Sequence, residues 1–177
     1  MPRIPELTQR DQIPVGKQHL YDTIQASRGG IRGPFGILLH SPEVAGRAAH
    51  LGAYLRYEST LSDADRELTI ITTAAFWGCK VEWAAHAKLA RQAGVSEQTM
   101  ETVRTQYSIE RLPEAEQLLV GYTRELLEKH EVSEATFKAA LSKYGQQGVV
   151  ELTATVGYYS MLATTLNAFQ VEPQSGL

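Results

Sequence analysis

The apolar residues of this chain recur every three or four positions, in stretches that are separated by Gly and Pro. Strict alternation of apolar and polar residues, which is typical of half-buried strands, is scarce. A three-to-four spacing places the apolar side chains on one side of successive helices. The sequence therefore predicts an all-α protein.

Helix start and stop signals divide the chain further, because Ser and Pro favour the first turn of a helix and Gly favours its end. A short apolar segment broken by glycine lies at 33–40. Helices are expected at 18–27, 42–58, 62–78, 79–94, from 96, 113–127, 133–145 and 152–169.

Residues 1–16 contain three of the seven prolines and predict an extended N-terminal arm that wraps a neighbour or stays loose. Residues 17–177 contain no linker or low-complexity tract and predict a single all-α domain. At 177 residues, the chain is long enough to bury a core without disulfides.

The charge balance and the cysteine count limit the partners. The chain carries 17 basic and 20 acidic side chains and a formal charge of −3, which gives no basic field for binding nucleic acid. A single cysteine excludes an intramolecular disulfide, and the first ten residues lack the apolar core of a secretory signal. We therefore expect a cytoplasmic protein without a nucleic-acid partner.

One segment has the minimum length for a membrane span. Residues 152–169 carry no charge over 18 positions, but they include four Thr, one Ser, one Asn and two Tyr. Polar groups in lipid need partners, so a run this mixed is more favourably housed in a protein core. The sequence predicts a buried helix here and no membrane partner.

A short internal repeat supports a degenerate duplication of a helical hairpin. Glu67-Leu68-Thr69 recurs 84 residues later at 151–153, and an amphipathic helix and a cap precede each copy. The Cys, Glu and His that follow the first copy have no equivalents after the second. The repeated Glu is therefore expected to be partly architectural.

The densest group of reactive side chains is Glu67, Cys79, Glu82 and His86. The last three are spaced i, i+3 and i+7, so they share one face of a helix. If the chain reverses near Gly78, Glu67 of the preceding helix reaches His86 across the hairpin and orients its imidazole. Cys79, near a helix start, would become a better thiolate, which predicts a nucleophile or acid, a base and an orienting group in one small volume.

Other interpretations of these residues remain open. The lone Cys is also typical of a small buried hydrophobic residue, and a helical His facing a Glu is also typical of a structural pair. The sulfur, oxygen and nitrogen donors of these four side chains are conceivable ligands for zinc. There is no HExxH motif, however, and no second Cys or His nearby, so no metal and no cofactor are expected. His40 ends an apolar stretch and is a candidate for lining a pocket.

The string ELTIITTAAFWGCKVEWAAHAKLARQAGV, residues 67–95, resembles the carboxymuconolactone decarboxylase and alkylhydroperoxidase D-like superfamily, and the similarity continues weakly to 151–169. The family's hydroperoxidases carry a Glu, then a Cys-x-x-Cys twelve residues on, then a His. Here Glu67, Cys79 and His86 match, whereas Glu82 replaces the second Cys. The resemblance implies an AhpD-like all-α fold and a homo-oligomer, a trimer or a hexamer.

The missing second Cys separates the activities that the resemblance implies. Resolution of an oxidised Cys79 as a disulfide within one subunit is impossible, so a peroxidase would need an external thiol. The decarboxylase branch needs no cofactor and no cysteine pair. It needs a proton donor and stabilisation of an enolate. We therefore expect a carboxy-lyase-like enzyme that acts on a small lactone or keto acid.

In this hypothesis His86 is the acid/base, Glu67 its orienting partner, Glu82 a second proton-transfer group and Cys79 a polar member of the pocket. The residues expected to contact substrate are Trp77, His40, Tyr158 and Tyr159. The alternatives are a one-Cys hydroperoxide reductase, with Cys79 as the nucleophile, and a catalytically silent oligomeric binding or scaffold protein.

Overall fold

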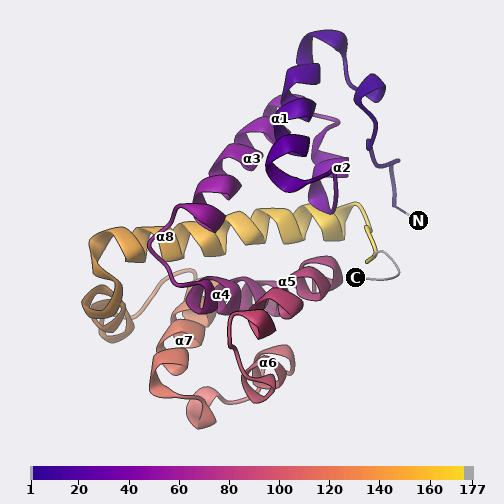
Figure 1. Cartoon of the computed structure of the whole chain (residues 1–177). Coiled ribbons are helices and arrows are strands. Elements are labelled where there is room, and N and C mark those ends of the chain that lie inside the picture. The colour runs from indigo at the N-terminus through magenta and orange to yellow at the C-terminus, as the bar shows by residue number, and fades with distance from the viewer. Residues whose placement is uncertain (1, 174–177) are drawn as a thin grey trace.

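The computed structural model describes residues 2–173, and within them the chain is helical and contains no strand. The longest helix, α8, crosses the middle of the molecule, with α1, α2 and α3 on one side and α4 to α7 on the other (Figure 1). The α-helices are α1 (Gln18–Arg28), α2 (Pro34–Leu38), α3 (Pro42–Tyr57), α4 (Asp63–Phe76), α5 (Lys80–Gln92), α6 (Glu97–Arg104), α7 (Glu114–Lys129) and α8 (Glu134–Ala168). Two 3-10 turns, Arg10–Gln12 and Val15–Lys17, precede α1, and a third, Ile109–Arg111, lies between α6 and α7. The predicted all-α architecture is thus present in residues 2–173.

The helix boundaries follow the expected caps. Ser62, Ser96 and Ser133 each accept a hydrogen bond from the backbone N–H three residues further on, at the starts of α4, α6 and α8. Gly29 ends α1 in the left-handed conformation that glycine adopts without strain. Local capping therefore determines most boundaries to within about two residues.

Helix α8 contains both of the helices predicted after Ser133. Gly145 has a positive φ of 67° and an extended ψ of 178°, so the helix bends sharply at the predicted break. The uncharged run 152–169 is only partly buried, which corrects the expectation of a buried helix. Its exposed face consists of Thr153, Gly157, Met161, Thr164, Asn167 and Ala168.

The core is divided by α8. One cluster joins α1, α2 and α3 to the second half of α8 through residues such as Ile24, Phe35 and Leu162. The other joins α4 to α7 with the first part of α8 through residues such as Ile71 and Leu119. Because α8 contributes to both clusters, it fixes the N-terminal helices relative to the α4–α5 hairpin.

The N-terminal arm packs against its own chain, which corrects the expectation that residues 1–16 stay loose. That the arm also wraps a neighbour stays a prediction. The backbone N–H of Leu7 donates to the carbonyl of Gly36 at 2.8 Å, and that of Arg3 donates to Phe169 at 2.8 Å. The arm therefore connects α2 with the end of α8. These contacts lie far apart in the sequence, so local patterns do not indicate them.

The two repeated Glu-Leu-Thr segments lie on α4 and α8. Glu151 is buried, and its carboxylate accepts hydrogen bonds from the backbone N–H of Thr60 at 2.8 Å and from the Thr60 hydroxyl at 2.6 Å. Tyr54 Oη donates to the other oxygen at 2.5 Å, and Gln147 donates to the same oxygen at 2.9 Å. Glu151 thus joins α8 to the α3–α4 connection, in the architectural role expected of it.

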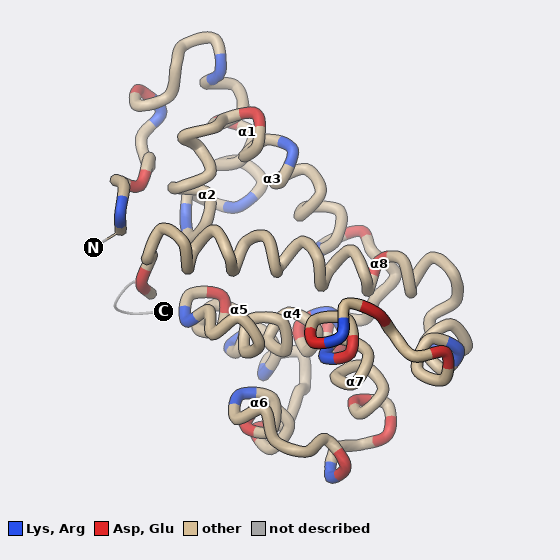
Figure 2. The backbone as a smooth tube through the Cα atoms, turned by 180° about the vertical axis from the view of Figure 1, so that it is seen from behind, with Lys and Arg blue, Asp and Glu red and all other residues tan. Residues whose placement is uncertain are grey.

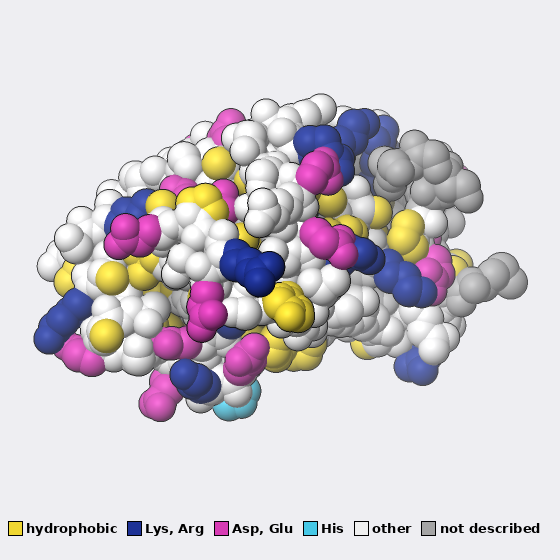
Figure 3. Space-filling model, turned by 90° about the horizontal axis from the view of Figure 1, so that it is seen from below, with side chains coloured by type: hydrophobic (Ala, Val, Ile, Leu, Met, Phe, Trp, Pro, Cys, Tyr) yellow, Lys and Arg dark blue, Asp and Glu magenta, His cyan; other side chains and the backbone are white. Residues whose placement is uncertain are grey.

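The surface carries charges of both signs. Figure 2 shows basic and acidic positions alternating along the chain, with basic positions beside α2. On the face seen in Figure 3, acidic, basic and hydrophobic side chains are interspersed rather than gathered into one charged surface. None of the helices in residues 2–173 combines the length and the hydrophobicity required to cross a membrane.

Candidate active site

The reversal predicted at Gly78 separates α4 from α5. Gly78 has a φ of 58°, and the backbone N–H of Cys79 returns to the carbonyl of Ala74 at 2.9 Å. A side chain at Gly78 would be strained at this φ, so glycine permits the tight turn. The turn places α4 and α5 against each other along their length.

Glu67 and His86 meet across this hairpin, as their spacing predicts. Glu67 Oε2 lies 2.7 Å from His86 Nδ1, and both side chains are buried, at 3% and 5% exposure. When Nδ1 donates to the carboxylate, Nε2 becomes the acceptor of the neutral ring. The outer oxygen of Glu67 lies 3.7 Å from Arg66 Nε, and Arg66 in turn donates to Asp63 at 2.8 Å.

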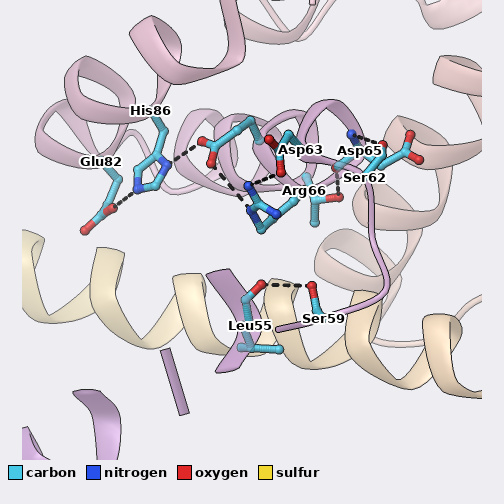
Figure 4. A network of polar contacts seen from close by, with 10 residues as sticks. Leu55, Ser59, Ser62, Asp63, Asp65, Arg66, Glu82 and His86 are labelled. Carbon is cyan, nitrogen blue, oxygen red and sulfur yellow. Dashed lines mark hydrogen bonds and ion pairs between the residues drawn. The ribbon is translucent and has the colours of Figure 1, made fainter. Parts of the chain in front are cut away.

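Glu82 flanks the other ring nitrogen. Its Oε2 lies 3.5 Å from His86 Nε2, one turn earlier on the same face of α5, and both project from that helix in Figure 4. This separation is longer than a good hydrogen bond, so Nε2 is free to engage a ligand. Burial raises the pKa of Glu82, and the charges of His86, Arg56 and Arg28 oppose this only in part.

Glu82 should therefore destabilise the fold at neutral pH. In the unfolded chain Glu82 ionises at its ordinary pKa, whereas in the folded chain it keeps its proton to higher pH. The free energy of unfolding therefore falls as the pH rises from the ordinary pKa of Glu82 through its raised pKa. Glu82→Gln is expected to raise the thermal unfolding midpoint at neutral pH and to leave it almost unchanged in acid. A midpoint difference that does not depend on pH would contradict this assignment.

A cavity of about 240 Å³ lies beside Glu82 and His86. Tyr159 contacts the histidine edge-on, with ring centroids 5.0 Å apart, and Tyr158 packs edge-on against Tyr159 at 5.3 Å. The wall is completed by the α1–α2 connection, α2, α3 and the C-terminal segment. The other lining residues are Glu6, Arg28, Gly30, Arg32, Gly33, Pro34, Phe35, Arg56, Val81, Ala85, Leu162, Val171 and Glu172.

The structure does not place Cys79 in this cavity. Its side chain is 1% exposed and packs against Val81, Ala163 and Leu166. Burial raises the pKa of the Cys79 thiol, and the backbone N–H groups of Val81 and Glu82 offset this only in part. The expected gain in thiolate character at the helix start is therefore wrong, because desolvation outweighs the helix dipole.

The Cys79 thiol is accordingly expected to react slowly with iodoacetamide in the folded protein. Intact-mass measurement at neutral pH should show alkylation many times slower than in denaturant, since both the low thiolate fraction and the burial oppose attack. A folded protein that is labelled as fast as the unfolded chain would show that the thiol is accessible.

Two of the residues expected to contact substrate lie outside the cavity. Trp77 is 37% exposed at the end of α4 and packs edge-on against Phe76, and its carbonyl accepts a hydrogen bond from Asn167 at 2.7 Å. The exposed His40 contacts the Pro5 carbonyl through Nε2 at 2.8 Å and thereby holds the N-terminal arm. Of the four aromatic and histidine candidates, Tyr158 and Tyr159 line the cavity.

Sequence patterns did not indicate the cationic side of the cavity. Arg28 and Arg56 occur in the last turns of α1 and α3, where basic residues are common because they interact favourably with the helix dipole. Only the packing of α1 against α3 and of α3 against α8 brings them to Glu82 and Tyr158. Among residues 2–173, His, Cys, Asp and Glu side chains form no group of three or more suited to hold a metal ion.

Comparison with known proteins agrees with this architecture. Residues 42–125 match the carboxymuconolactone decarboxylase family. A solved structure of an uncharacterized peroxidase-related protein from Ralstonia eutropha JMP134, described as an alkylhydroperoxidase AhpD core, is 19% identical, with a TM-score of 0.78 over 98% of this chain and 93% of that chain. A peroxidase-related protein from Silicibacter sp. TM1040 is 18% identical, with a TM-score of 0.76 over 98% and 94%.

A third solved structure, of the debrominase Bmp8 without ligand, is 14% identical, with a TM-score of 0.71 over 97% of this chain and 92% of that chain. Comparison with proteins of curated function finds no match. At these identities the solved structures show the fold. The family match spans α3 to most of α7, and the solved structures share the helical architecture, so the chain is similar to the carboxymuconolactone decarboxylase family in this region and has the fold of the AhpD-like structures.

Proposed function

We propose that the protein is a cofactor-free enzyme that decarboxylates a small lactone acid or keto acid by proton transfer. The observation that carries this proposal is the position of the two reactive groups. His86 and Glu82 border the cavity, whereas Cys79 is buried outside it. The family includes decarboxylases, and decarboxylation requires no thiol.

The three polar side chains have distinct roles in this reaction. When the carbon–carbon bond to the leaving carboxylate breaks, CO2 is released. The electron pair of that bond moves into the conjugated carbonyl and forms an enolate. Glu82, whose protonated form is favoured by burial, donates a hydrogen bond to the enolate oxygen without giving up its proton. Doubly protonated His86, with Nδ1 donating to Glu67, delivers the Nε2 proton to the carbon and becomes the neutral ring whose Nε2 is an acceptor. Solvent then returns the proton.

The decarboxylase proposal is favoured over a thiol peroxidase for a physical reason. A peroxidase needs an accessible thiolate, but the Cys79 thiol is 1% exposed and its pKa is raised by burial. Cys79 is then a packing residue beside α8, and its replacement by Ala should slow the enzyme only slightly.

A panel of compounds tests the proposal. The protein is incubated separately with β-keto acids, unsaturated lactone acids and organic hydroperoxides, the last with an external thiol. We expect release of CO2 from at least one acid and no peroxide reduction above the buffer rate. Peroxide reduction that requires Cys79, or a complete lack of reaction with the acids, would overturn the proposal.

We also infer that the protein assembles with copies of itself. The exposed face of α8 carries no charge from Thr153 to Ala168 and includes Met161, which supports contact with another copy. Sedimentation analysis of the full chain is expected to give a trimer or a hexamer. A monomer at micromolar concentration would contradict the inference.

A further inference from the structure

Two hydrogen-bond donors in the cavity wall lack partners. Tyr158 Oη and Arg28 Nε are buried and make no hydrogen bond with any other atom of residues 2–173. Tyr158 is 4% exposed as a whole, and both residues line the cavity. A buried donor without an acceptor costs about 1–3 kcal/mol, so natural proteins keep few of them unless a ligand or water completes them.

The two donors are held in place from several sides. The guanidinium of Arg28 lies 4.2 Å from the centroid of the Phe35 ring, and one of its terminal nitrogens donates to the Ala49 carbonyl at 3.3 Å. A Cβ atom at Gly52 would lie 2.1 Å from Tyr158 Oη and 2.8 Å from Arg28 Nη2. Glycine at this position of α3 therefore leaves the room in which the phenol and the guanidinium come together.

The charges around these donors favour an anion. Arg56 lines the same cavity, and its charge and that of Arg28 act on both Glu82 and Tyr158. Three carboxyl groups also border the cavity. Burial favours the protonated form of Glu82, and Glu172 is paired with Lys80, whose Nζ lies 3.5 Å away. Glu6 is the third carboxyl group. A fixed guanidinium and a phenol present the N–H and O–H groups that a carboxylate accepts.

We propose that Arg28 and Tyr158 form a carboxylate-binding subsite that anchors a small organic acid with its reacting carbon at His86. The proposal rests on the proposed function for the identity of the reaction, but the binding itself does not. A cavity of about 240 Å³ exceeds the roughly 150 Å³ that accommodates a benzene ring, so a six-membered ring with one carboxylate fits.

The anchored carboxylate is the one that the reaction retains. Pairing with a guanidinium stabilises a carboxylate as an anion, which opposes its loss as CO2. The group that leaves must therefore be a second carboxylate, placed at His86 and not at Arg28. The subsite thus restricts the substrates to small acids that carry two carboxylates, or one carboxylate and a group ionised in the same way.

Calorimetric titration of the full chain with benzoate tests the subsite without requiring turnover. Benzamide is the neutral control, because it has nearly the same shape as benzoate but does not offer two negatively charged oxygens as hydrogen-bond acceptors. We expect benzoate to bind at least about tenfold more tightly than benzamide. Equal affinities for the two compounds would overturn the proposal.

Two substitutions locate the site. Tyr158→Phe keeps the ring and removes only the hydroxyl, and it is expected to weaken benzoate binding about tenfold while leaving benzamide binding unchanged. Arg28→Met is expected to abolish the preference for benzoate. The matched controls are Tyr144→Phe, another tyrosine of α8 outside the cavity lining, and Arg47→Met, an exposed arginine of α3. Both controls should bind benzoate like the wild type.

The fold of the variants is checked by thermal unfolding without ligand. Tyr158→Phe should unfold at the wild-type temperature or above it, because it removes a buried hydroxyl that has no partner. Wild-type affinity for benzoate in both cavity variants would overturn the subsite. If benzoate binds as expected but no acid is decarboxylated, the subsite stands and the proposed function fails. If an acid is decarboxylated but benzoate binds no more tightly than benzamide, the proposed function stands and the subsite fails.

Discussion

Replacement of His86 by Ala is expected to lower kcat/KM for the decarboxylated acid by roughly 10²–10⁴-fold, the range lost when a positioned general acid or base is removed. His86 is the side chain that contacts both Glu67, at 2.7 Å, and Glu82, at 3.5 Å, beside the cavity. Its loss removes the proton donor at the reacting carbon. Steady-state kinetics with CO2 detection gives the measurement.

Three further variants make this prediction specific. Cys79→Ser should retain kcat/KM within about tenfold, because the thiol lies outside the cavity. Glu67→Gln should reduce kcat more than it changes KM, since Glu67 positions the imidazole and does not border the cavity. Benzoate binding should persist in His86→Ala and shows that the cavity remains intact. A full-rate His86→Ala enzyme would exclude the proposed mechanism.

The largest effect on stability is expected at Glu151. Burial raises the pKa of this carboxyl, but hydrogen bonds from Thr60, Tyr54 and Gln147 outweigh it and lower the pKa to about 2, from an ordinary value of 4.5. Linkage converts this difference into about 3 kcal/mol of stability at neutral pH. A lowered pKa stabilises the fold above the unfolded value, so the contribution disappears as the pH falls from about 4.5 toward 2.

Glu151→Gln removes the charge and nearly preserves the shape. Urea unfolding at neutral pH is expected to show a loss of about 3 kcal/mol, and the gap to the wild type should close as the solution is acidified. Glu97→Gln, an exposed glutamate paired with Arg91, is the control and should change stability little. A gap that persists unchanged in acid would show that shape, rather than charge, is what Glu151 provides.

Local features of the sequence predicted the helices and the Glu67–His86 contact. The caps at Ser62, Ser96 and Ser133, together with the glycine at 78, act within a few residues of the boundaries they produce. The contact follows from helical rise on either side of one tight turn. Both inferences need only neighbouring residues, so one sequence suffices for them.

The environment of Cys79 and the cationic wall of the cavity depend on packing between distant segments. Cys79 contacts Ala163 and Leu166, more than 80 residues further along the chain, and this burial reverses its expected acidity. Arg28 is followed by Gly29, and an arginine followed by a glycine is common at the end of a helix. The end of α1 is therefore a sufficient explanation for this pattern. Neither residue carries a local signal of its position relative to α8.

Two of the stretches of chain that line the cavity have separate tasks in the proposed function. The groups proposed to transfer protons come from the α4–α5 hairpin inside the region matched to the family, whereas Arg28 and Phe35 come from residues that precede it. Substitutions in the leading helices can consequently redirect ligand choice while the chemistry at the hairpin stays as it is. For protein engineering, α1 and α2 are thus the elements to randomise when a new substrate is wanted.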